Sequence, residues 1–388
     1  MRAVYWMDKV YLSYNNIVSS LGFDSETVMN AISNETSGIQ LIDDKTLFQT
    51  PFYAALINPK TLGNATNDLG LSPGCTRLEK MMILSLHKVI KAVNIPLDKN
   101  VGLIISTTKG NIDVLESNSD FPHERAYLSA SGAVLKDFFQ FENEPIILSN
   151  ACVSGLLAVS VAKRYIHQKL YDHVFIVSGD IVSQFVLSGF NSFQALSDEP
   201  CKPYSINRSG INLGEVAASV LVTSNTANLT TESVEILGDA SCNDANHISG
   251  PSRTGEGLYR SIKNAIQESK VEIGGIDYIS AHGTATIFND EMEAVAFNRV
   301  GLSHIPLNSL KGYFGHTLGA SGLVETIVGM HSLHRNTLFS SAGYDTLGVS
   351  QPMNVITKTT EKQLNIFLKT ASGFGGCNTA AVFKKINK

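Results

Sequence analysis

Short apolar runs rich in β-branched residues alternate with longer amphipathic segments along most of the chain. The runs at 101–106, 145–149 and 174–178 are typical of buried strands. Residues 76–93 and 156–168 carry apolar side chains at helical spacing. Strands and helices that alternate through short loops predict an α/β fold rather than a helical bundle or a β-sandwich.

The pattern is interrupted by one polar stretch and then begins again. Residues 224–231 are mostly Ser, Asn and Thr, and we expect a boundary there between a first half, residues 1–225, and a second half, residues 226–388. After the boundary the pattern predicts further strands and helices at 233–237, 256–269, 276–280, 290–300, 305–309 and 320–334. Residues 145–160 and 306–325 follow the same plan of strand, small-residue turn and helix, which is consistent with a duplication.

Composition narrows the class of protein. The 388 residues include 30 Lys+Arg and 35 Asp+Glu, with a formal net charge of −5 and 43% hydrophobic residues. Such a chain folds into a globular core, and its mild acidity without a basic run argues against nucleic acid as a partner. The longest apolar run, near 155–162, is shorter than the roughly 18–20 residues of a membrane helix. Residues 1–9 lack the apolar core of a secretory signal, so we expect a cytoplasmic protein that does not associate with a membrane.

The cysteines are few and scattered. They show no CxxC pair and no spacing typical of zinc ligands, so we expect a reducing compartment, no disulfide framework and no metal site. A small buried apolar role is the default for each of Cys75, Cys152, Cys201, Cys242 and Cys377.

Cys152 is the cysteine with a special setting, because an apolar strand ends and a helix begins around it. Ala151 and Gly155 are small enough to let backbone or substrate come close. The dipole and free N–H groups of a helix N-terminus would stabilise a thiolate. On this segment alone, a nucleophile and a structural cysteine in a strand–helix turn both remain open.

Three further segments contain candidate chemistry. His282 follows a predicted strand, at the end where open α/β sheets place ligands. Lys311 and His316 lie in a glycine-rich loop that lacks the GK[ST] of a phosphate loop. Phe374 lies between glycines, which suggests strained backbone amides near a site. A core histidine or an ordinary loop would explain each segment equally well by itself.

Together and in this order, the four segments resemble the elongating β-ketoacyl-acyl-carrier-protein synthases of the thiolase superfamily. The resemblance covers nearly the whole chain and includes residues 201–215, which are similar to that family's CRPFDxxRDGFxxGEG stretch. It implies a five-layered α-β-α-β-α thiolase-like fold with two similar halves. It also implies a dimer, usually of identical subunits paired through an edge strand, although a heterodimer with a ketosynthase-like subunit is possible.

The resemblance assigns roles to individual residues. Cys152 would be the acylated nucleophile, with His282 and His316 as the other members of a Cys–His–His triad. Lys311 would organise the second histidine, and Glu325 would be the acid in the following helix.

Further roles follow from the same resemblance. The backbone N–H groups of Cys152 and Phe374 would form an oxyanion hole, and the Phe374 side chain would be a gate between the acyl and malonyl sites. An acidic acyl carrier protein would dock on basic residues such as Arg77 and Lys80, although a solvated helix face explains these two as well. No metal or free cofactor is expected, because the substrates arrive on the phosphopantetheine of the carrier.

The implied activity is the decarboxylative Claisen condensation of malonyl-carrier with an acyl group on Cys152, in fatty-acid or specialised polyene or polyketide elongation. We expect His282 and His316 to serve decarboxylation more than acyl transfer, because the enolate oxygen needs side-chain donors. The alternative is a non-catalytic, chain-length-factor-like partner of a ketosynthase, which would lack the nucleophile. A thiolase or a cysteine hydrolase would account for fewer of the motifs.

Some segments depart from the family pattern. Cys377 replaces the usual Thr, and residues 107–152 are shorter than usual. These departures leave the triad intact and leave the acyl chain preference and the pathway open.

Overall fold

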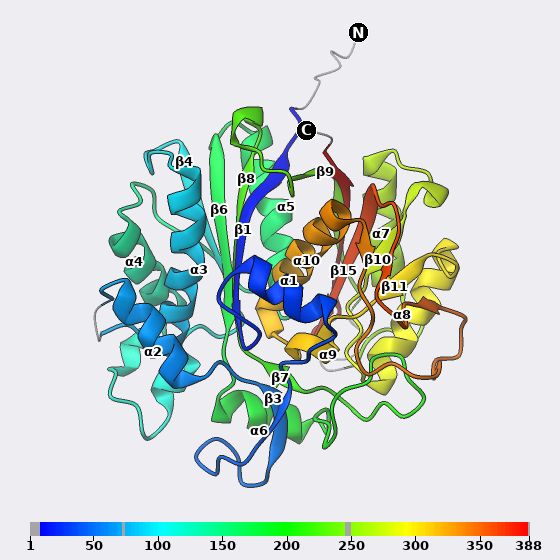
Figure 1. Ribbon diagram of the computed structural model, residues 1–388, viewed down its shortest axis with the longest axis horizontal. Helices are drawn as coiled ribbons and strands as arrows, with labels where there is room; N and C mark the ends of the chain where they lie inside the picture. Colours follow the sequence, from blue (N-terminus) through cyan, green and yellow to red (C-terminus); the bar gives the residue numbers. More distant parts are fainter. Residues whose placement is uncertain (1–7, 72–73, 245–249, 387–388) are drawn as a thin grey trace.

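Two similar half-sheets meet edge to edge in the computed structural model, which describes residues 8–71, 74–244 and 250–386 (Figure 1). Most of the segment 1–9, in which we expect no secretory signal, therefore lies outside the described residues. In the described ranges, no helix combines the length and apolar character needed to cross a bilayer. All five cysteines are free thiols.

The first half-sheet has the order β5-β4-β6-β8-β1. Its strands are β1 (Tyr11–Ser19), β4 (Val101–Ser106), β5 (Ile146–Leu148), β6 (His173–Asp180) and β8 (Val216–Thr223). The second half-sheet has the order β11-β10-β15-β16-β9. Its strands are β9 (Val234–Asn243), β10 (Tyr278–Ser280), β11 (Pro306–Asn308), β15 (Ile366–Gly373) and β16 (Cys377–Lys385).

Both halves share one topology. In each, three neighbouring strands run parallel, and the next two pair antiparallel. The halves join where β1 pairs with β9 over Tyr11↔Glu235 and Leu12↔Val234, so that one continuous sheet results. β13 (Asn354–Val355) extends this sheet beyond β11.

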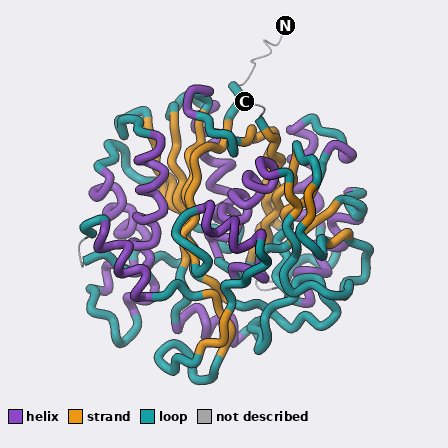
Figure 2. The backbone as a smooth tube through the Cα atoms, in the orientation of Figure 1, coloured by secondary structure: helices purple, strands orange, loops and turns teal. Residues whose placement is uncertain are grey.

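Helices form three layers around the half-sheets (Figures 1 and 2). α3 (Arg77–Val93) packs on the outer face of the first half-sheet. α7 (Glu256–Ser269) and α8 (Ile287–Val300) cover the outer face of the second. α5 (Ser154–His167) and α10 (Ser321–Arg335) lie between the two half-sheets. The expected five-layered α-β-α-β-α fold is therefore confirmed.

Smaller elements complete the fold. The remaining helices are α1 (Ser25–Ser33), α2 (Pro59–Asp68), α4 (Leu128–Phe139), α6 (Gln184–Ser192) and α9 (Lys311–Phe314). Short 3-10 helices are η1 (Ile112–Leu115), η2 (His123–Ala126), η3 (Thr226–Asn228), η4 (Ile273–Gly275) and η5 (Leu318–Ala320). Two small sheets consist of β2 (Gln40–Ile42), β3 (Phe52–Ala55) and β7 (Leu213–Gly214), and of β12 (Thr337–Leu338) and β14 (Thr360–Glu361).

Local sequence signals explain where several elements begin and end. Thr76 caps α3 in a capping box with Glu79, which fixes the start of that helix. The prediction for β9 was too short, because its last residues are polar and half-exposed. Pairing of Asn243 with Cys377 of β16 extends the strand beyond the apolar stretch that the sequence pattern detects.

The two central helices approach each other closely at glycines. A Cβ placed on Gly155 of α5 would lie 2.7 Å from the backbone N of Leu323 and 2.8 Å from the carbonyl of Gly319. A Cβ on Gly322 of α10 would lie 2.5 Å from the backbone N of Leu156. Every residue of α10 from 321 to 333 is buried, so the helix has no free space into which it could shift.

We predict that Gly155→Ala lowers the free energy of unfolding by about 1–3 kcal/mol, because the added methyl group overlaps backbone atoms. Gly63→Ala in α2 is the matched control, since nothing lies within 4 Å of a Cβ at that position. The control should gain about 0.5–1 kcal/mol from helix propensity. Urea denaturation measures both, and equal effects in the two variants would contradict the packing argument.

Candidate active site

Cys152 lies in a tight turn between β5 and α5. Ala151, directly before it, has φ +44°, a left-handed conformation that is strained for a residue with a side chain. Ser154 stabilises the turn, since its hydroxyl donates to the carbonyl of Ala151 at 2.6 Å and accepts from the backbone N of Asn150 at 2.8 Å. The turn therefore fixes the direction of the Cys152 side chain, which is 7% exposed.

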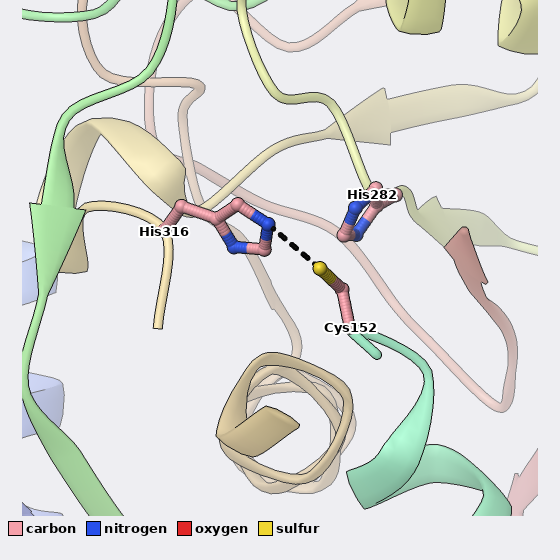
Figure 3. Close-up of side chains that lie close together, drawn as sticks. All are labelled: Cys152, His282 and His316. Carbon is pink, nitrogen blue, oxygen red and sulfur yellow. Dashed lines mark hydrogen bonds between the residues drawn. The ribbon is translucent and has the colours of Figure 1, made fainter. Parts of the chain in front are cut away.

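Three segments that are distant in sequence bring Cys152, His282 and His316 together (Figure 3). The His316 Nε2 lies 3.1 Å from the Cys152 sulfur. The two imidazole rings are 5.3 Å apart at an angle of 80°. The sulfur and one nitrogen of each ring all lie within 4.8 Å of one another. The structure thus brings together the three residues that the sequence motifs singled out.

Burial sets the protonation state of this trio. Burial raises the pKa of the Cys152 thiol to about 12. Burial, reinforced by the Lys311 charge, holds the pKa of both His282 and His316 well below the usual range. Burial therefore opposes the stabilisation of a thiolate that we expect from the helix N-terminus. At neutral pH the site holds a thiol and two neutral imidazoles.

The two histidines differ in their contacts. The His316 Nδ1 lies 3.1 Å from the Ser321 hydroxyl, which can donate or accept a hydrogen bond and so supports either tautomer. The His282 Nδ1 is buried and has no hydrogen-bond partner among the described residues. His282 is instead fixed through its backbone, where its N–H donates to Glu293 at 2.9 Å and its carbonyl accepts from Lys311 at 2.9 Å.

A cluster of three buried charges lies behind the histidines. Lys311 forms an ion pair with Glu325, and the Lys369 ammonium lies 2.8 Å from the other Glu325 oxygen. Sequence analysis missed Lys369, whose only signal is a lysine inside the apolar strand β15. We expected Lys311 to organise His316, but its ammonium is hydrogen-bonded to the carbonyl of His282. Its charge still acts on both rings.

Two buried acids in α8 were also missed. Glu293 accepts hydrogen bonds from the backbone N–H groups of His282 and Gly283, at 2.9 and 2.7 Å. Asp290 accepts from the backbone N of Thr284 at 3.0 Å. These carboxylates stabilise the loop that carries His282. The sequence signal was the spacing of two acids on one helix face directly after that loop.

The trio faces a cavity of about 430 Å³. Phe374 lies at this cavity and is 37% exposed. Its ring centre is 5.6 Å from that of Phe190 and 5.4 Å from that of Phe193. A Cβ on Gly373 would lie 3.0 Å from the backbone N of Cys152. The loop that carries Phe374 therefore packs directly on the cysteine turn.

The predicted docking residues lie on α3 and are not among the residues that line the cavity. Arg77 forms a two-fold interaction with Glu215, with nitrogen–oxygen distances of 2.9 and 2.6 Å. The Arg77 side chain is still 26% exposed, and its role in docking stays a prediction. Lys80 is partly buried on the same helix, and its role in docking stays a prediction.

We interpret the trio as a catalytic set rather than a metal centre. The His316 Nε2 is hydrogen-bonded to the sulfur, which is the contact that a nucleophile with an adjacent base requires. A thiol beside one neutral imidazole and close to a second can perform nucleophilic acyl transfer.

We predict that Glu325→Gln lowers the free energy of unfolding by about 3–5 kcal/mol, because Lys311 and Lys369 would then share a buried site without a counter-charge. Adding Lys369→Met should recover part of the loss. Glu199→Gln, which removes an exposed ion pair with Lys202, is the control and should cost less than about 1 kcal/mol. Similar losses of unfolding free energy in the two Glu variants, measured by urea denaturation, would show that the buried charge cluster does not stabilise the fold as predicted.

Comparisons with known proteins agree with this geometry. Residues 91–227 match the β-ketoacyl synthase N-terminal domain, and residues 234–345 match the β-ketoacyl synthase C-terminal domain. A 3-oxoacyl-[acyl-carrier-protein] synthase 2 of Rhizobium meliloti is 32% identical over 61% of this chain and 59% of its own length. A 3-oxoacyl-[acyl-carrier-protein] synthase 1 of Buchnera aphidicola is 25% identical over 98% of this chain and 100% of its own length.

The fold has close structural relatives as well. A chain from the complex of the ketosynthase ApeO with its chain length factor ApeC, from Xenorhabdus doucetiae, has a TM-score of 0.86 at 22% identity and full coverage of both chains. The alignment with the Rhizobium relative spans about three fifths of that protein, whereas the Buchnera relative is matched along its whole length. With both domains matched in order along one chain, the protein belongs to the β-ketoacyl synthase family.

Proposed function

We propose that this protein is an acyltransferase that condenses a malonyl unit with an acyl group held on Cys152, with loss of CO₂. The observation that carries the proposal is the Cys152 sulfur, 3.1 Å from the His316 Nε2, at a cavity of about 430 Å³. A buried nucleophile with an adjacent base beside a cavity is what acyl transfer requires.

In the first step, the sulfur attacks the carbonyl carbon of an acyl thioester. The unprotonated His316 Nε2 accepts the thiol proton and then returns it to the departing carrier thiol. The S–C bond of the carrier thioester breaks as the S–C bond to Cys152 forms, so no net proton is gained or lost. The backbone N–H groups of Cys152 and Phe374 stabilise the tetrahedral oxyanion.

In the second step, a malonyl thioester loses CO₂ and leaves an enolate. The imidazole N–H of His282 stabilises the enolate oxygen. His316 adds a second donor once its proton has moved from Nδ1 to Nε2, a tautomer that the Ser321 hydroxyl supports by donating to Nδ1, and two neutral rings do not repel each other. The enolate carbon then attacks the acyl-Cys152 carbonyl, the C–S bond to Cys152 breaks, and the departing thiolate takes up one proton from solvent to restore the thiol. Phe374, packed on Phe190 and Phe193 at the cavity, is placed to separate the acyl and malonyl sides.

The proposed substrates are thioesters on the phosphopantetheine of an acyl carrier protein, without a further cofactor. Relatives named 3-oxoacyl-[acyl-carrier-protein] synthase support this choice. Lys80 and Arg77 are the candidates for carrier docking, and Arg77 also forms an ion pair with Glu215.

A dimer is the proposed assembly. β5 ends the sheet and pairs only with β4 among the described strands, so its other edge is available to a second subunit. An identical subunit or a ketosynthase-like partner would both fit this edge. The matched complex of a ketosynthase with its chain length factor supports the second arrangement.

The rival function is that of a non-catalytic, chain-length-factor-like subunit. Cys152 in hydrogen-bond contact with His316 argues against it, because such a subunit needs no activated sulfur. The pathway, whether fatty-acid or specialised polyene or polyketide elongation, depends on the acyl group and the partner.

We expect incubation with an acyl-carrier thioester to place the acyl group on Cys152. Peptide mass spectrometry locates the adduct, and Cys152→Ala should abolish it. Cys377→Ala is the matched control and should keep the adduct. An adduct on Cys377, or one that persists in Cys152→Ala, would overturn the assignment.

Substitutions of the two histidines should have different effects on the acylation and condensation rates. His282→Ala should lower the condensation rate by ~10²–10³ through loss of one enolate donor, with acylation of Cys152 nearly unchanged. His316→Ala should lower both rates, because this ring contacts the sulfur. This differs from our expectation from the sequence motifs, in which both histidines serve decarboxylation more than acyl transfer. Single-turnover acylation and CO₂ release from malonyl-carrier measure the two steps. Normal acylation in His316→Ala would show that this ring is not the base.

A further inference from the structure

Lys369 is a buried lysine whose ammonium group is surrounded by oxygen atoms. It lies in β15, with none of its surface exposed. Its Nζ donates hydrogen bonds to three backbone carbonyls, those of Ser280 at 3.0 Å, Ala281 at 3.3 Å and Thr370 at 2.6 Å. The Nζ also lies 2.8 Å from Oε2 of Glu325. Because an ammonium group has three N–H donors and a neutral amine has only two, these acceptors favour the charged form of Lys369.

Three charged side chains together hold the backbone from residue 280 to residue 283. Lys369 binds the two carbonyls directly before His282, at residues 280 and 281. Lys311 donates to the carbonyl of His282 at 2.9 Å. Glu293 accepts from the backbone N–H groups of residues 282 and 283, at 2.9 and 2.7 Å. Lys369 is thus the anchor at the point where the chain leaves β10 and reaches His282.

The position of the His282 ring depends on these backbone contacts. Its Nδ1 is buried and has no hydrogen-bond partner among the described residues. The His316 ring differs, because its Nδ1 lies 3.1 Å from the Ser321 hydroxyl. Both rings lie beside the Cys152 sulfur (Figure 3), but the backbone alone directs the Nδ1 side of His282. A shift of the carbonyls at residues 280 and 281 would therefore move this ring more than the other.

The charge of Lys369 has a smaller effect on His282 than its hydrogen bonds. Lys311 and Lys369 share the single carboxylate of Glu325. Burial lowers the pKa of Lys369, and the Glu325 charge opposes that effect. Burial, Lys311, His316 and Lys369, in that order, lower the pKa of His282. Because Lys369 has the smallest of these four effects, its contacts with the backbone are its main link to the site.

We propose that Lys369 is a positioning residue for His282 in the decarboxylation of the malonyl unit. Its ammonium fixes the two carbonyls at the end of β10, and thereby the ring that donates to the enolate oxygen. The inference rests on the proposed function. Lys369 is not among the residues that line the cavity, so it acts through His282 and does not contact the substrate.

The kinetic test compares Lys369→Met with Lys163→Met. Lys163 is a second buried lysine, paired with Asp239 at 2.9 Å and Glu268 at 2.8 Å, and it does not line the cavity. Lys369→Met should slow CO₂ release from malonyl-carrier by about 10- to 100-fold, because a displacement of about 1 Å at a reacting group can cost that much. Acylation of Cys152 should stay nearly unchanged. Lys163→Met should leave both rates unchanged even where it lowers stability.

A second measurement follows the His282 ring without any substrate. In protein that contains isotope-labelled histidine, the NMR resonances of this ring are assigned by their loss in His282→Ala. Lys369→Met should shift them, and Lys163→Met should not. If Lys369→Met does not fold, Lys369→Gln replaces it. The Gln amide can still donate to a carbonyl, so this variant should show smaller changes in the same direction.

Unshifted His282 resonances in Lys369→Met, or equal losses in acylation and CO₂ release, would overturn the inference. Slower CO₂ release in Lys163→Met to the same extent would overturn it as well, because lower stability would then explain both variants. The NMR readout is independent of the proposed function. If the resonances shifted while the wild type released no CO₂ from malonyl-carrier, the proposed function alone would fail.

Discussion

The close contact of α5 with α10 is the constraint on which the active site depends. Cys152 lies two residues before α5, and His316 lies a few residues before α10, so the separation of the helix N-termini sets the distance between sulfur and imidazole. Gly155 and Gly322 allow this approach because neither has a Cβ to hold the backbones apart. The 3.1 Å contact between the two side chains is therefore a consequence of core packing.

The same packing removes water and thereby decides the chemistry. Desolvation makes both the thiolate and the imidazolium costly, so the resting site is neutral. A neutral site can accept a thioester without a strong electrostatic bias, but it must then form an anionic sulfur and an anionic enolate oxygen. The backbone N–H groups of Cys152 and Phe374, the imidazole N–H groups and the nearby lysines are fixed donors and charges that stabilise these transient anions.

Sequence analysis predicted the strands and helices next to Cys152, His282 and His316, because each of them has a local signal. It predicted neither the antiparallel strands β1, β8, β15 and β16 nor the helices α1, α2, α4 and α6, and the five layers were expected from the family resemblance alone. Thr76 with Glu79 marks a helix start, and small residues around Cys152 mark a turn. Sequence analysis assigned no role to Lys369, Glu293 or Asp180, because their partners come from segments that are distant in sequence. The burial of Cys152 could not be predicted for a related reason. A helix N-terminus is visible in sequence, whereas the depth of burial, which raises the pKa of the thiol, depends on the whole fold.

The shared topology of the halves explains why one site results from two similar parts. In the first half β5 leads through a tight turn to α5, and in the second β11 leads through α9 and a longer turn to α10. Both helices end up in the central layer, so the two turns face each other there. The shorter turn presents a sulfur and the longer one an imidazole. Similar backbones that carry different side chains thus form a single asymmetric site, with His282 added at the end of the neighbouring strand β10.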